Sequence, residues 1–511
     1  MQLNENQKKA IKDDSNVLII VAGPGTGKTR VLSEKINYLI KDKSIKPSKI
    51  LALTFTKRAA NELKERIKNK SVITETFHSL AFDYLQSINK NLTIITNFER
   101  NETLSILSKE FKKSKRNISN YISLFKSKLS KKQDLLIDKY NKLLSDSGKI
   151  DFDDLLLYFL GTNIDLDFDY ILIDEFQDTN IIQYEIIKKL KSTKTNLVVV
   201  GDPLQSIYSF RGSDSNIFET IKKDFPKVKT ITLNINYRNT KEIINISKEL
   251  FPVAANFVAH NKSQSIIQNI LSLDNKSQSQ FIVDFIISKV GGIDLMSSSN
   301  FHSEENSSFK DFAVLYRNHH LAKHISEKLT ESGIPYQKIG DSIWQSKEFE
   351  TLIQILKENE NKNQVIFEVI KENNIDLSDE LLQRINLIDQ KYLKISDFLN
   401  YIEELKNKEY FDENLEFVTL SSIHSSKGLE FKNVIILDSE IKNKNNFDEE
   451  KRLMYVAVTR AKNNLIIISS QKSDLAMLVE NVTPQKEDPK TAKIKEKRFK
   501  FKLKKSQQSL F

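Results

Sequence analysis

Residues 16–30, NVLIIVAGPGTGKTR, restrict the fold of this chain more than any other stretch. An apolar, β-branched run at 16–21 predicts a buried strand, and apolar residues at helical spacing over 31–40 predict a helix. Glycines in the turn between them allow backbone N–H groups to converge on a phosphate. Because a strand, a glycine-rich turn and a helix in this order make a phosphate-binding loop, we expect this chain to bind a nucleoside triphosphate.

The residues of the predicted loop divide the work of holding a nucleotide. Lys28 is expected to reach the β- and γ-phosphates, and the Thr29 hydroxyl to ligate Mg²⁺. Ala22 stands where the GxxxxGK[ST] pattern has its first glycine. The residues predicted to line the loop are Ala22, Gly23, Pro24, Gly25, Thr26, Gly27, Lys28, Thr29 and Arg30.

Two further apolar runs end in polar residues that suit the same chemistry. The run at 170–173 leads into Asp174, expected to hold Mg²⁺, and Glu175, expected to polarise the attacking water. Adjacent carboxylates are otherwise a solvated turn, but after a buried strand in a P-loop protein we favour the functional interpretation. The run at 197–200 leads to Gln205, placed to sense the γ-phosphate. Tyr208, Phe210 and Arg211 follow, and their aromatic faces and cation suit single-stranded nucleic acid, although such a cluster is often core.

Composition narrows the class of protein. The formal net charge of +10 and the pI of about 9.1 suggest a polyanionic partner such as nucleic acid, although lysine-rich solvated faces need no partner. The absence of cysteine excludes disulfides and thiolate metal sites. No apolar run approaches the roughly 18–20 residues of a membrane span, and the polar start does not resemble a signal peptide. We therefore expect a cytoplasmic protein without a membrane partner.

Ten short segments between Leu3 and Ala461 follow one another in an order that can be compared with known motifs. They are LNENQ, AGPGTGKT, LTFTKRAANEL, TFHSLA, DFDDLL, LIDEFQDTN, GDPLQSIYSFRG, NINYR, SSIHSSKGLEF and RLMYVAVTRA. In this order they match the motifs of the UvrD/Rep-like superfamily 1 DNA helicases, and the chain resembles that family over nearly its whole length. No single match beyond the phosphate loop is decisive, but ten in order leave little room for coincidence.

The resemblance implies an α/β fold with two RecA-like P-loop domains, parallel sheets flanked by helices, each with a helical insertion. We expect domain 1A at 1–84 and 146–231 and its insertion 1B at 85–145. Domain 2A is expected at 232–345 and 416–473, with strands at 312–316, 418–421, 434–437 and 465–468, and a reduced insertion 2B at 346–415. The implied activity is hydrolysis of ATP with Mg²⁺, driving 3′→5′ translocation on single-stranded DNA and unwinding at duplex junctions, in repair or replication at the nucleoid.

The resemblance also implies roles for individual residues. The expected catalytic residues are Lys28, Asp174, Glu175, Gln205, Arg238 and Arg460, with Thr29 and Asp174 on the metal. Gln7 is expected to read adenine, Tyr237 to stack on it, Glu430 to contact the ribose and the Gly428 backbone the phosphates. The residues that match DNA-binding positions are Phe55, Thr56, His78, Tyr208, Phe210, Arg211, Arg317 and His424.

Departures from the family pattern leave a second function open. Lys57-Arg58 replaces the usual Asn-Lys, and Phe210 replaces a frequent Trp. The 2B region is much shorter than is usual, which puts duplex contacts and autoregulation in doubt. An accessory ATPase that displaces proteins without productive unwinding is therefore the alternative. A P-loop ATPase unrelated to nucleic acid is a third interpretation. The motifs do not indicate an oligomeric state.

The sequence after about residue 473 differs from the rest. Residues 484–505 are rich in Lys and Arg, which predicts a disordered basic arm that contacts phosphates weakly or serves solubility. The chain then reads QQSLF, similar to peptides that dock bacterial repair proteins in the sliding clamp. Gln507 offers an amide, and Leu510 and Phe511 are apolar anchors for a groove. Short motifs also arise by chance, so a clamp partner is a hypothesis here.

Overall fold

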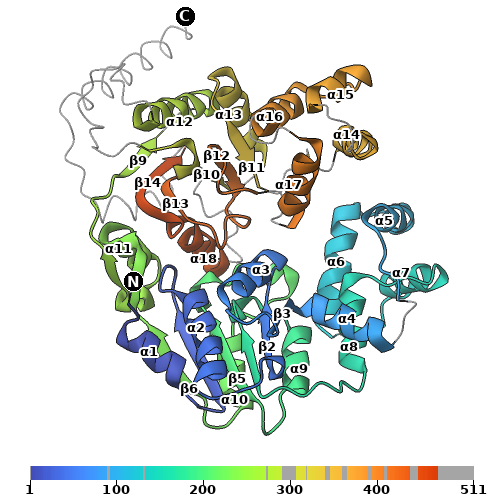
Figure 1. Ribbon diagram of the computed structural model, residues 1–511, viewed down its shortest axis with the longest axis vertical. Coiled ribbons are helices and arrows are strands. Elements are labelled where there is room, and N and C mark those ends of the chain that lie inside the picture. Colours follow the sequence, from blue (N-terminus) through green and yellow to red (C-terminus); the bar gives the residue numbers. More distant parts are fainter. Residues whose placement is uncertain are drawn as a thin grey trace, which may run out of the picture.

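The computed structural model describes residues 2–88, 92–129, 133–271, 274–290, 307–317, 319–339, 344, 346–359, 365–389, 394–407, 411–437 and 447–469. They form a mixed α/β fold on two six-stranded sheets, one in the lower and one in the upper part of Figure 1. All paired strands within each sheet are parallel. The predicted fold class is therefore confirmed. The basic arm and the QQSLF peptide lie outside the described residues.

The first sheet carries the phosphate loop and has the strand order β3-β2-β4-β5-β1-β6. Its strands are β1 (Val17–Ala22), β2 (Ile50–Thr54), β3 (Ile73–Thr76), β4 (Tyr170–Ile173), β5 (Asn196–Gly201) and β6 (Lys229–Leu233). The central strands are buried on both faces, as continuous apolar runs in parallel sheets require. The predicted strands at 16–21, 170–173 and 197–200 are confirmed to within one residue at each end.

Helices cover both faces of the first sheet, each face with its own apolar core. On one face lie α1 (Glu5–Lys12), α2 (Lys28–Lys41) and α3 (Lys57–Arg66), and on the other α4 (Phe77–Ile88), α8 (Phe152–Gly161), α9 (Ile181–Leu190) and α10 (Ile217–Asp224). Short 3₁₀ turns punctuate the connections: η1 (Pro47–Lys49), η2 (Phe176–Asp178), η3 (Pro203–Gln205) and η4 (Ser209–Arg211). The carboxyl ends of β1, β4 and β5 lie at the same edge of the sheet. The polar residues that follow these strands are therefore brought together.

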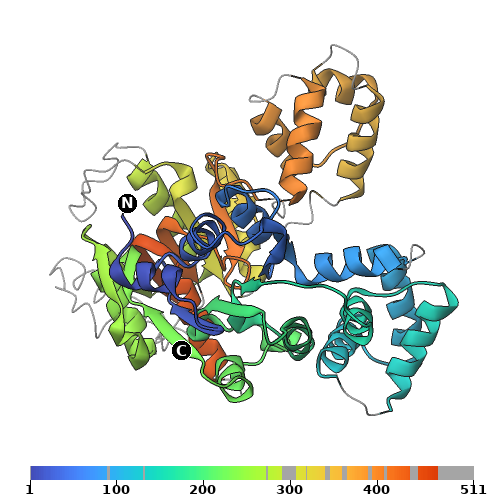
Figure 2. The same ribbon diagram turned by 60° about the horizontal axis from the view of Figure 1, so that its bottom comes forward.

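We call the part of the chain that forms the first sheet the first half, and the part from β7 (Ile235–Thr240) onward, which forms the second sheet, the second half. Three helices project from the first half, between α4 and α8 in the sequence. They are α5 (Asn97–Phe111), α6 (Lys115–Ser127) and α7 (Leu135–Asp146). They pack around a small core of their own that includes Leu107, Ile118, Ile122 and Tyr140. Figure 2 shows this group extending to one side of the sheet.

The second sheet has the order β11-β12-β10-β13-β14-β9. Its strands are β9 (Ile267–Leu271), β10 (Phe312–Tyr316), β11 (Tyr336–Lys338), β12 (Val418–Ser422), β13 (Phe431–Leu437) and β14 (Ala461–Ser469). Helices α11 (Lys241–Leu250) and α18 (Phe447–Val458) pack on one face, and α12 (Asn275–Val290) and α13 (His319–Glu331) on the other. All four predicted strands are present, and β13 and β14 begin a few residues earlier than expected.

Two smaller groups complete the described fold. Strands β7 (Ile235–Thr240) and β8 (Val258–Asn261) form a separate parallel pair; the remaining 3₁₀ turns are η5 (Pro252–Asn256) and η6 (Phe309–Asp311). Helices α14 (Lys347–Glu358), α15 (Ile366–Glu372), α16 (Asp379–Asp389) and α17 (Ile395–Asn407) share one apolar core and stand off from both sheets (Figure 2). Within the described residues, none of the helices combines the length and the apolar character needed to cross a membrane.

Candidate nucleotide site and aromatic cluster

The phosphate loop connects β1 to α2 through two residues in the left-handed region. Gly25 has a φ of 66° and Gly27, the N-cap of α2, a φ of 86°, where a side chain would be strained. The Thr26 hydroxyl donates to the Gly23 carbonyl at 2.8 Å and holds the turn closed. Lys28 opens the helix, and its Nζ lies 3.9 Å from Glu175 Oε1. The loop therefore has the form that the sequence predicts, with its lysine beside the predicted catalytic acid.

Strand β7 packs directly against this loop. The Tyr237 N–H donates to the Gly25 carbonyl at 2.8 Å, and Asn236 Nδ2 donates to the Pro24 carbonyl at 2.9 Å. A Cβ at Gly25 would lie 2.4 Å from that of Arg238, so glycine is required here by close approach as well as by φ. The NINYR segment thus lies beside the loop, where the resemblance expects it.

Gln7 lies beneath the loop with both ends of its amide engaged. Its Oε1 accepts from the Asn4 N–H at 3.0 Å in a capping box on α1, and its Nε2 donates to the Thr26 carbonyl at 3.0 Å. Asn4 Nδ2 in turn donates to the Tyr237 hydroxyl at 2.9 Å. Gln7 therefore couples α1 to the loop, and the expected contact with adenine stays a prediction.

The two predicted acids occupy different environments. Asp174 is buried at the end of β4, and its N–H donates to the Leu53 carbonyl at 2.9 Å. Glu175 adopts a left-handed φ of 49°, which a non-glycine residue holds only when its surroundings fix it. Gln177 does this: its Nε2 donates to the Glu175 carboxylate, and its Oε1 accepts from the Asp202 N–H at 2.9 Å.

Local charge separates the ionisation of the two acids. Burial raises the pKa of Asp174, and the neighbouring Glu175 charge raises it further. Burial acts on Glu175 in the same sense, but Lys28, Lys427, the Gln177 hydrogen bond and Arg460 outweigh it and lower its pKa. Glu175 is therefore ionised, as a residue that polarises water must be. The Asp174 carboxylate and the Thr29 hydroxyl are oxygen donors of the kind Mg²⁺ prefers.

Arg460 from the second half is buried against Gln205. Its Nη2 donates to Gln205 Oε1 at 3.2 Å, and its Nη1 to the Leu429 carbonyl at 2.9 Å. Gln205 Nε2 donates to Asp202 Oδ2 at 2.8 Å, so Gln205 links a first-half carboxylate to a second-half cation. Burial lowers the pKa of Arg460 to about 9, with Arg238 adding to the effect. Arg460 is still charged at neutral pH.

A second cation, Lys427 of the second half, also contacts residues of the first half. It was not among the predicted site residues. Its Nζ lies 2.7 and 2.6 Å from the two oxygens of Asp178 and 2.7 Å from the Gln205 carbonyl oxygen. Burial raises the pKa of Asp178 to about 6 although Lys427 lowers it. Both residues belong to recognised motifs, SKGLEF and DEFQDTN, but nothing in the sequence pairs them.

Arg238, expected to be catalytic, and Glu430, expected to contact the ribose, contact each other. Arg238 Nη2 lies 2.6 Å from Glu430 Oε2, and Lys462 Nζ lies 2.8 Å from Glu430 Oε1. Gly428, with a φ of 89°, makes the turn that leads to them. These side chains lie at the boundary between β7 and the second sheet, so their nucleotide contacts stay predictions.

Four of the residues assigned to DNA form one aromatic cluster. Phe55 stacks on Tyr208 with ring centroids 5.4 Å apart, and Phe210 meets the His424 ring edge-on at 5.6 Å. The Tyr208 hydroxyl donates to the His424 carbonyl at 3.3 Å. Phe210 is 54% exposed, so it offers a face to a ligand. Because His424 follows β12 and the other three rings belong to the first half, the cluster spans both halves.

The other residues assigned to DNA are not among the stacked rings of this cluster. Thr56 caps α3 by accepting from the Ala59 N–H at 3.1 Å. His78 lies beside Phe152, and burial lowers its pKa to about 4, so it is neutral at pH 7. Arg317 Nη2 lies 2.8 Å from Glu450. The side chain of Arg211 is outside the described part of the chain.

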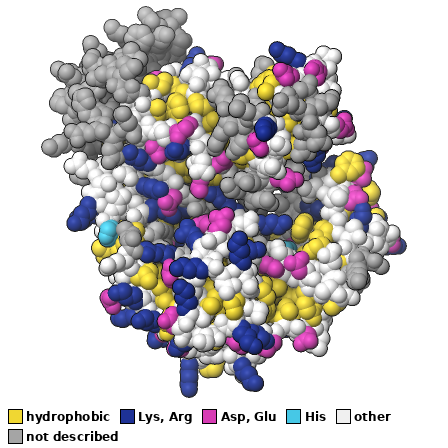
Figure 3. Space-filling view, in the orientation of Figure 1, with side chains coloured by type: hydrophobic (Ala, Val, Ile, Leu, Met, Phe, Trp, Pro, Cys, Tyr) yellow, Lys and Arg dark blue, Asp and Glu magenta, His cyan; other side chains and the backbone are white. Residues whose placement is uncertain are grey.

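Two surface features bear on where a ligand could bind. Figure 3 shows Lys and Arg side chains on both sides of the recess between the lower and upper parts of the molecule.

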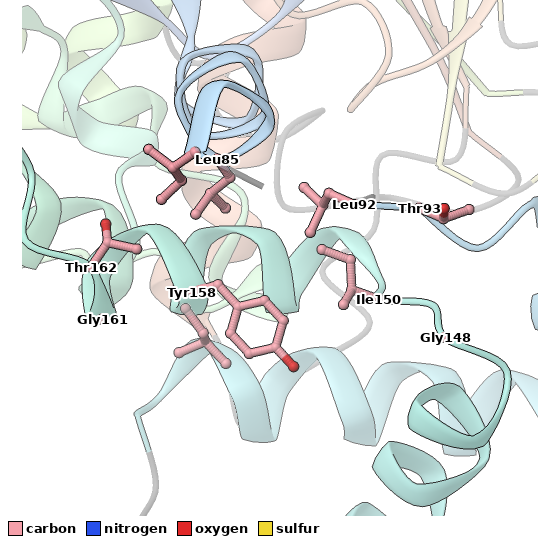
Figure 4. A pocket seen from close by; sticks show the side chains of 10 residues that line it. Leu85, Leu92, Thr93, Gly148, Ile150, Tyr158, Gly161 and Thr162 are labelled. Atoms are coloured by element: carbon pink, nitrogen blue, oxygen red, sulfur yellow. The ribbon is translucent and has the colours of Figure 1, made fainter. Parts of the chain in front are cut away.

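A cavity of about 570 Å³ opens elsewhere, between α4 and α8, and is lined mainly by aliphatic side chains such as Leu85 and Ile150 together with Tyr158 (Figure 4). Its lining residues carry no charge, so it does not suit a nucleotide or a DNA strand.

Comparison with known proteins places this geometry in context. A family model described as UvrD/REP helicase N-terminal domain matches residues 3–124 and 89–226, and one described as UvrD-like helicase C-terminal domain matches 231–419 and 402–472. The chain is 34% identical to the ATP-dependent DNA helicase Rep of Buchnera aphidicola over 70% of this chain and 58% of that protein. It is 28% identical to the ATP-dependent DNA helicase PcrA of Staphylococcus aureus, over 91% of this chain and 83% of PcrA.

The buried Lys427–Asp178 pair generates a prediction about stability. Lys427→Met or Asp178→Asn alone leaves one partner buried without its counterpart, which costs about 3–5 kcal/mol. The double variant should recover most of that loss in urea unfolding followed by circular dichroism. The matched control is Lys310→Met, which removes an exposed ion pair with Glu416 and should cost at most about 1 kcal/mol. Additive losses in the double variant would show that the two side chains are not coupled.

Proposed function

Because this chain belongs to the UvrD/Rep-like family of superfamily 1 helicases, we propose that it is an ATP-dependent DNA helicase that moves 3′→5′ on single-stranded DNA and unwinds duplex. The observation that carries the proposal is that the nucleotide site and the aromatic cluster both lie where the two halves of the chain meet. Glu175 and Gln205 of the first half face Arg460 and Lys427 of the second, and the aromatic cluster spans the same boundary. A change of ligand at the nucleotide site can therefore move the aromatic cluster.

The proposal divides the chain into four units and an arm. Domain 1A comprises 1–84 and 146–231, domain 2A 232–345 and 416–473, and the insertions are 1B at 85–145 and a reduced 2B at 346–415. The separate apolar cores of α5–α7 and of α14–α17 support the two insertions. The arm at 474–511 ends in Gln507–Phe511, for which we keep the hypothesis of a sliding-clamp contact.

In the proposed reaction, the first half holds the nucleotide. The loop N–H groups and Lys28 bind the phosphates, and Thr29 and Asp174 would hold Mg²⁺, which neutralises phosphate charge when bound. Glu175, kept ionised by its cationic neighbours, orients the attacking water. Gln177 holds the Glu175 carboxylate in position through its side-chain amide.

The second half supplies the positive charge that the transition state needs. Arg460 is buried beside Gln205, and Arg238 follows the segment packed on the loop. Both are proposed to stabilise charge on the transferring phosphoryl group. When that group leaves, the attraction between the halves weakens. This cycle of closure and release moves His424 relative to Tyr208 and Phe210, and hydrolysis would in this way advance a single DNA strand stacked on these rings. The proposed location is the cytoplasm, at the nucleoid.

One observation favours the alternative of an accessory ATPase that displaces proteins. The comparison with PcrA extends over 618 aligned positions, more than the 511 residues of this chain. More than about a hundred positions of PcrA therefore have no counterpart here, in line with the short 2B region. A strand-displacement assay run beside a protein-displacement assay on single-stranded DNA separates the two functions. Displacement of protein without release of a strand would favour the alternative.

Two substitutions at the nucleotide site should abolish turnover for different reasons. Lys28→Ala removes a phosphate ligand and should weaken nucleotide binding as well as hydrolysis. Glu175→Gln keeps the shape but removes the base, so a fluorescent ATP analogue should still bind while DNA-stimulated phosphate release falls by about 10²-fold or more. Near-normal turnover of Glu175→Gln would contradict the catalytic assignment.

The aromatic cluster generates a prediction about DNA binding. Losing one base stack costs about 1–3 kcal/mol, so Phe210→Ala should weaken binding of a single-stranded oligonucleotide about 5- to 150-fold in fluorescence anisotropy. The matched control is Phe98→Ala on α5, an aromatic residue 72% exposed and distant in sequence from the cluster. Equal affinities of the two variants would mean that Phe210 does not stack on a base.

A further inference from the structure

Lys126 is a buried cation near the end of α6. Its side chain is 3% exposed, and its Nζ lies 2.9 Å from Asp151 Oδ2 and 2.7 Å from Asp154 Oδ1. The ring of Tyr140 on α7 lies 4.9 Å from the same atom. One ammonium group therefore joins α6 and α7 of the projecting helices to the start of α8.

The two carboxylates have a structural task of their own. Asp151 caps α8, accepting from the Asp154 N–H at 2.7 Å, and Asp154 accepts in return from the Asp151 N–H at 3.3 Å. Two buried carboxylates this close repel each other unless a cation compensates them. Lys126 supplies that cation, so the position of α6 and the cap of α8 depend on each other.

The next residue after Lys126 touches the aromatic segment of the first half. Ser127 is buried, and a Cβ built on Gly212 would lie 2.4 Å from Ser127 Oγ and 2.8 Å from Ser127 Cβ. Gly212 has a φ of 83° and closes the turn of η4, its N–H donating to the Ser209 carbonyl at 2.9 Å. The end of α6 therefore rests on the turn that presents Tyr208 and Phe210.

The second half also holds this turn, through a different residue. The Ser209 N–H donates to the Glu449 carboxylate of α18 at 3.1 Å, and the Ser209 hydroxyl donates to it as well. The turn thus lies between α18, which moves with the second sheet, and α6, which is fastened by Lys126. A turn supported on one side only would follow α18 and lose its fixed position.

We propose that Lys126 is a positioning residue for DNA binding: by fixing the end of α6 against Gly212, it holds the turn that presents Tyr208 and Phe210 while the second half moves. The proposal rests on the proposed helicase function and adds a task for the helices α5–α7. They serve as the rigid support of the aromatic segment on the first half. Lys126 itself touches neither nucleotide nor DNA in this account.

The test measures ATP hydrolysis by the full chain with increasing single-stranded oligonucleotide. Lys126→Met should raise the oligonucleotide concentration for half-maximal stimulation about fivefold or more, the loss expected when one base stack is impaired. Hydrolysis without DNA should stay at the wild-type rate. The matched control is Lys139→Met on α7, which breaks an exposed ion pair with Glu110 and should leave both quantities unchanged.

A second pair of variants addresses the contact without removing a charge, in case Lys126→Met does not fold. Ser127→Val adds volume against Gly212 and should raise the half-maximal concentration in the same way, whereas Ser127→Ala adds none and should behave as wild type. A folded Lys126→Met or Ser127→Val with wild-type stimulation would overturn the proposal. So would an equal loss of hydrolysis without DNA. If DNA does not stimulate the wild type at all, it is the helicase function that fails.

Discussion

The bridge that Lys427 makes to Asp178 and the Gln205 carbonyl is the interaction on which the rest of the cleft depends. The carboxyl edge of the first sheet collects acidic side chains in a buried place: Asp174, Glu175, Asp178 and Asp202. Burial acts to raise the pKa of all four, and in Asp174, Asp178 and Asp202 it outweighs the nearby cations, so that their pKa values are raised. Lys28 offsets part of this charge, and Lys427 and Arg460 of the second half offset more of it. The first half is therefore electrostatically incomplete without the second.

This charge balance is the basis of the proposal that a triphosphate links the halves. In that proposal a bound γ-phosphate adds negative charge between the acidic edge and the arginines, and its departure removes that charge. Gln205 lies at the centre of this exchange, since its side chain contacts Asp202 and Arg460 and its carbonyl contacts Lys427. Three residues further on, Tyr208 begins the aromatic cluster. Ile207 between them is buried in a core shared with α11 and α18, so the backbone between Gln205 and Tyr208 is anchored to the second half by packing.

Local patterns in the sequence were enough to predict the most apolar strands and the phosphate loop. Buried parallel strands are continuous apolar runs, so β1, β4 and β5 could be placed to within a residue, and the loop followed from its glycines and flanking elements. Contacts between distant motifs could not be found in this way. Lys427 and Asp178 are 249 positions apart, and no periodicity relates them. Gln7 belongs to the LNENQ motif, and its cap on α1 is local, but the hydrogen bond from its Nε2 to the Thr26 carbonyl is decided only by the tertiary structure. Lys126 appears as one lysine among many in a basic region, and its burial comes from the packing of three helices.

The absence of cysteine from the chain permits a direct measurement of closure. Spin labels on cysteines introduced at Glu65 of α3 and Thr330 of α13, both exposed, report the distance between the two halves by pulsed electron paramagnetic resonance. With a non-hydrolysable ATP analogue and a single-stranded oligonucleotide, the distance distribution should shift and narrow. The same labels in an Arg460→Ala background should show no such change, because the cation that we propose responds to the γ-phosphate is missing. An identical distribution with and without the analogue in the otherwise unaltered chain would contradict the claim that nucleotide binding joins the two halves.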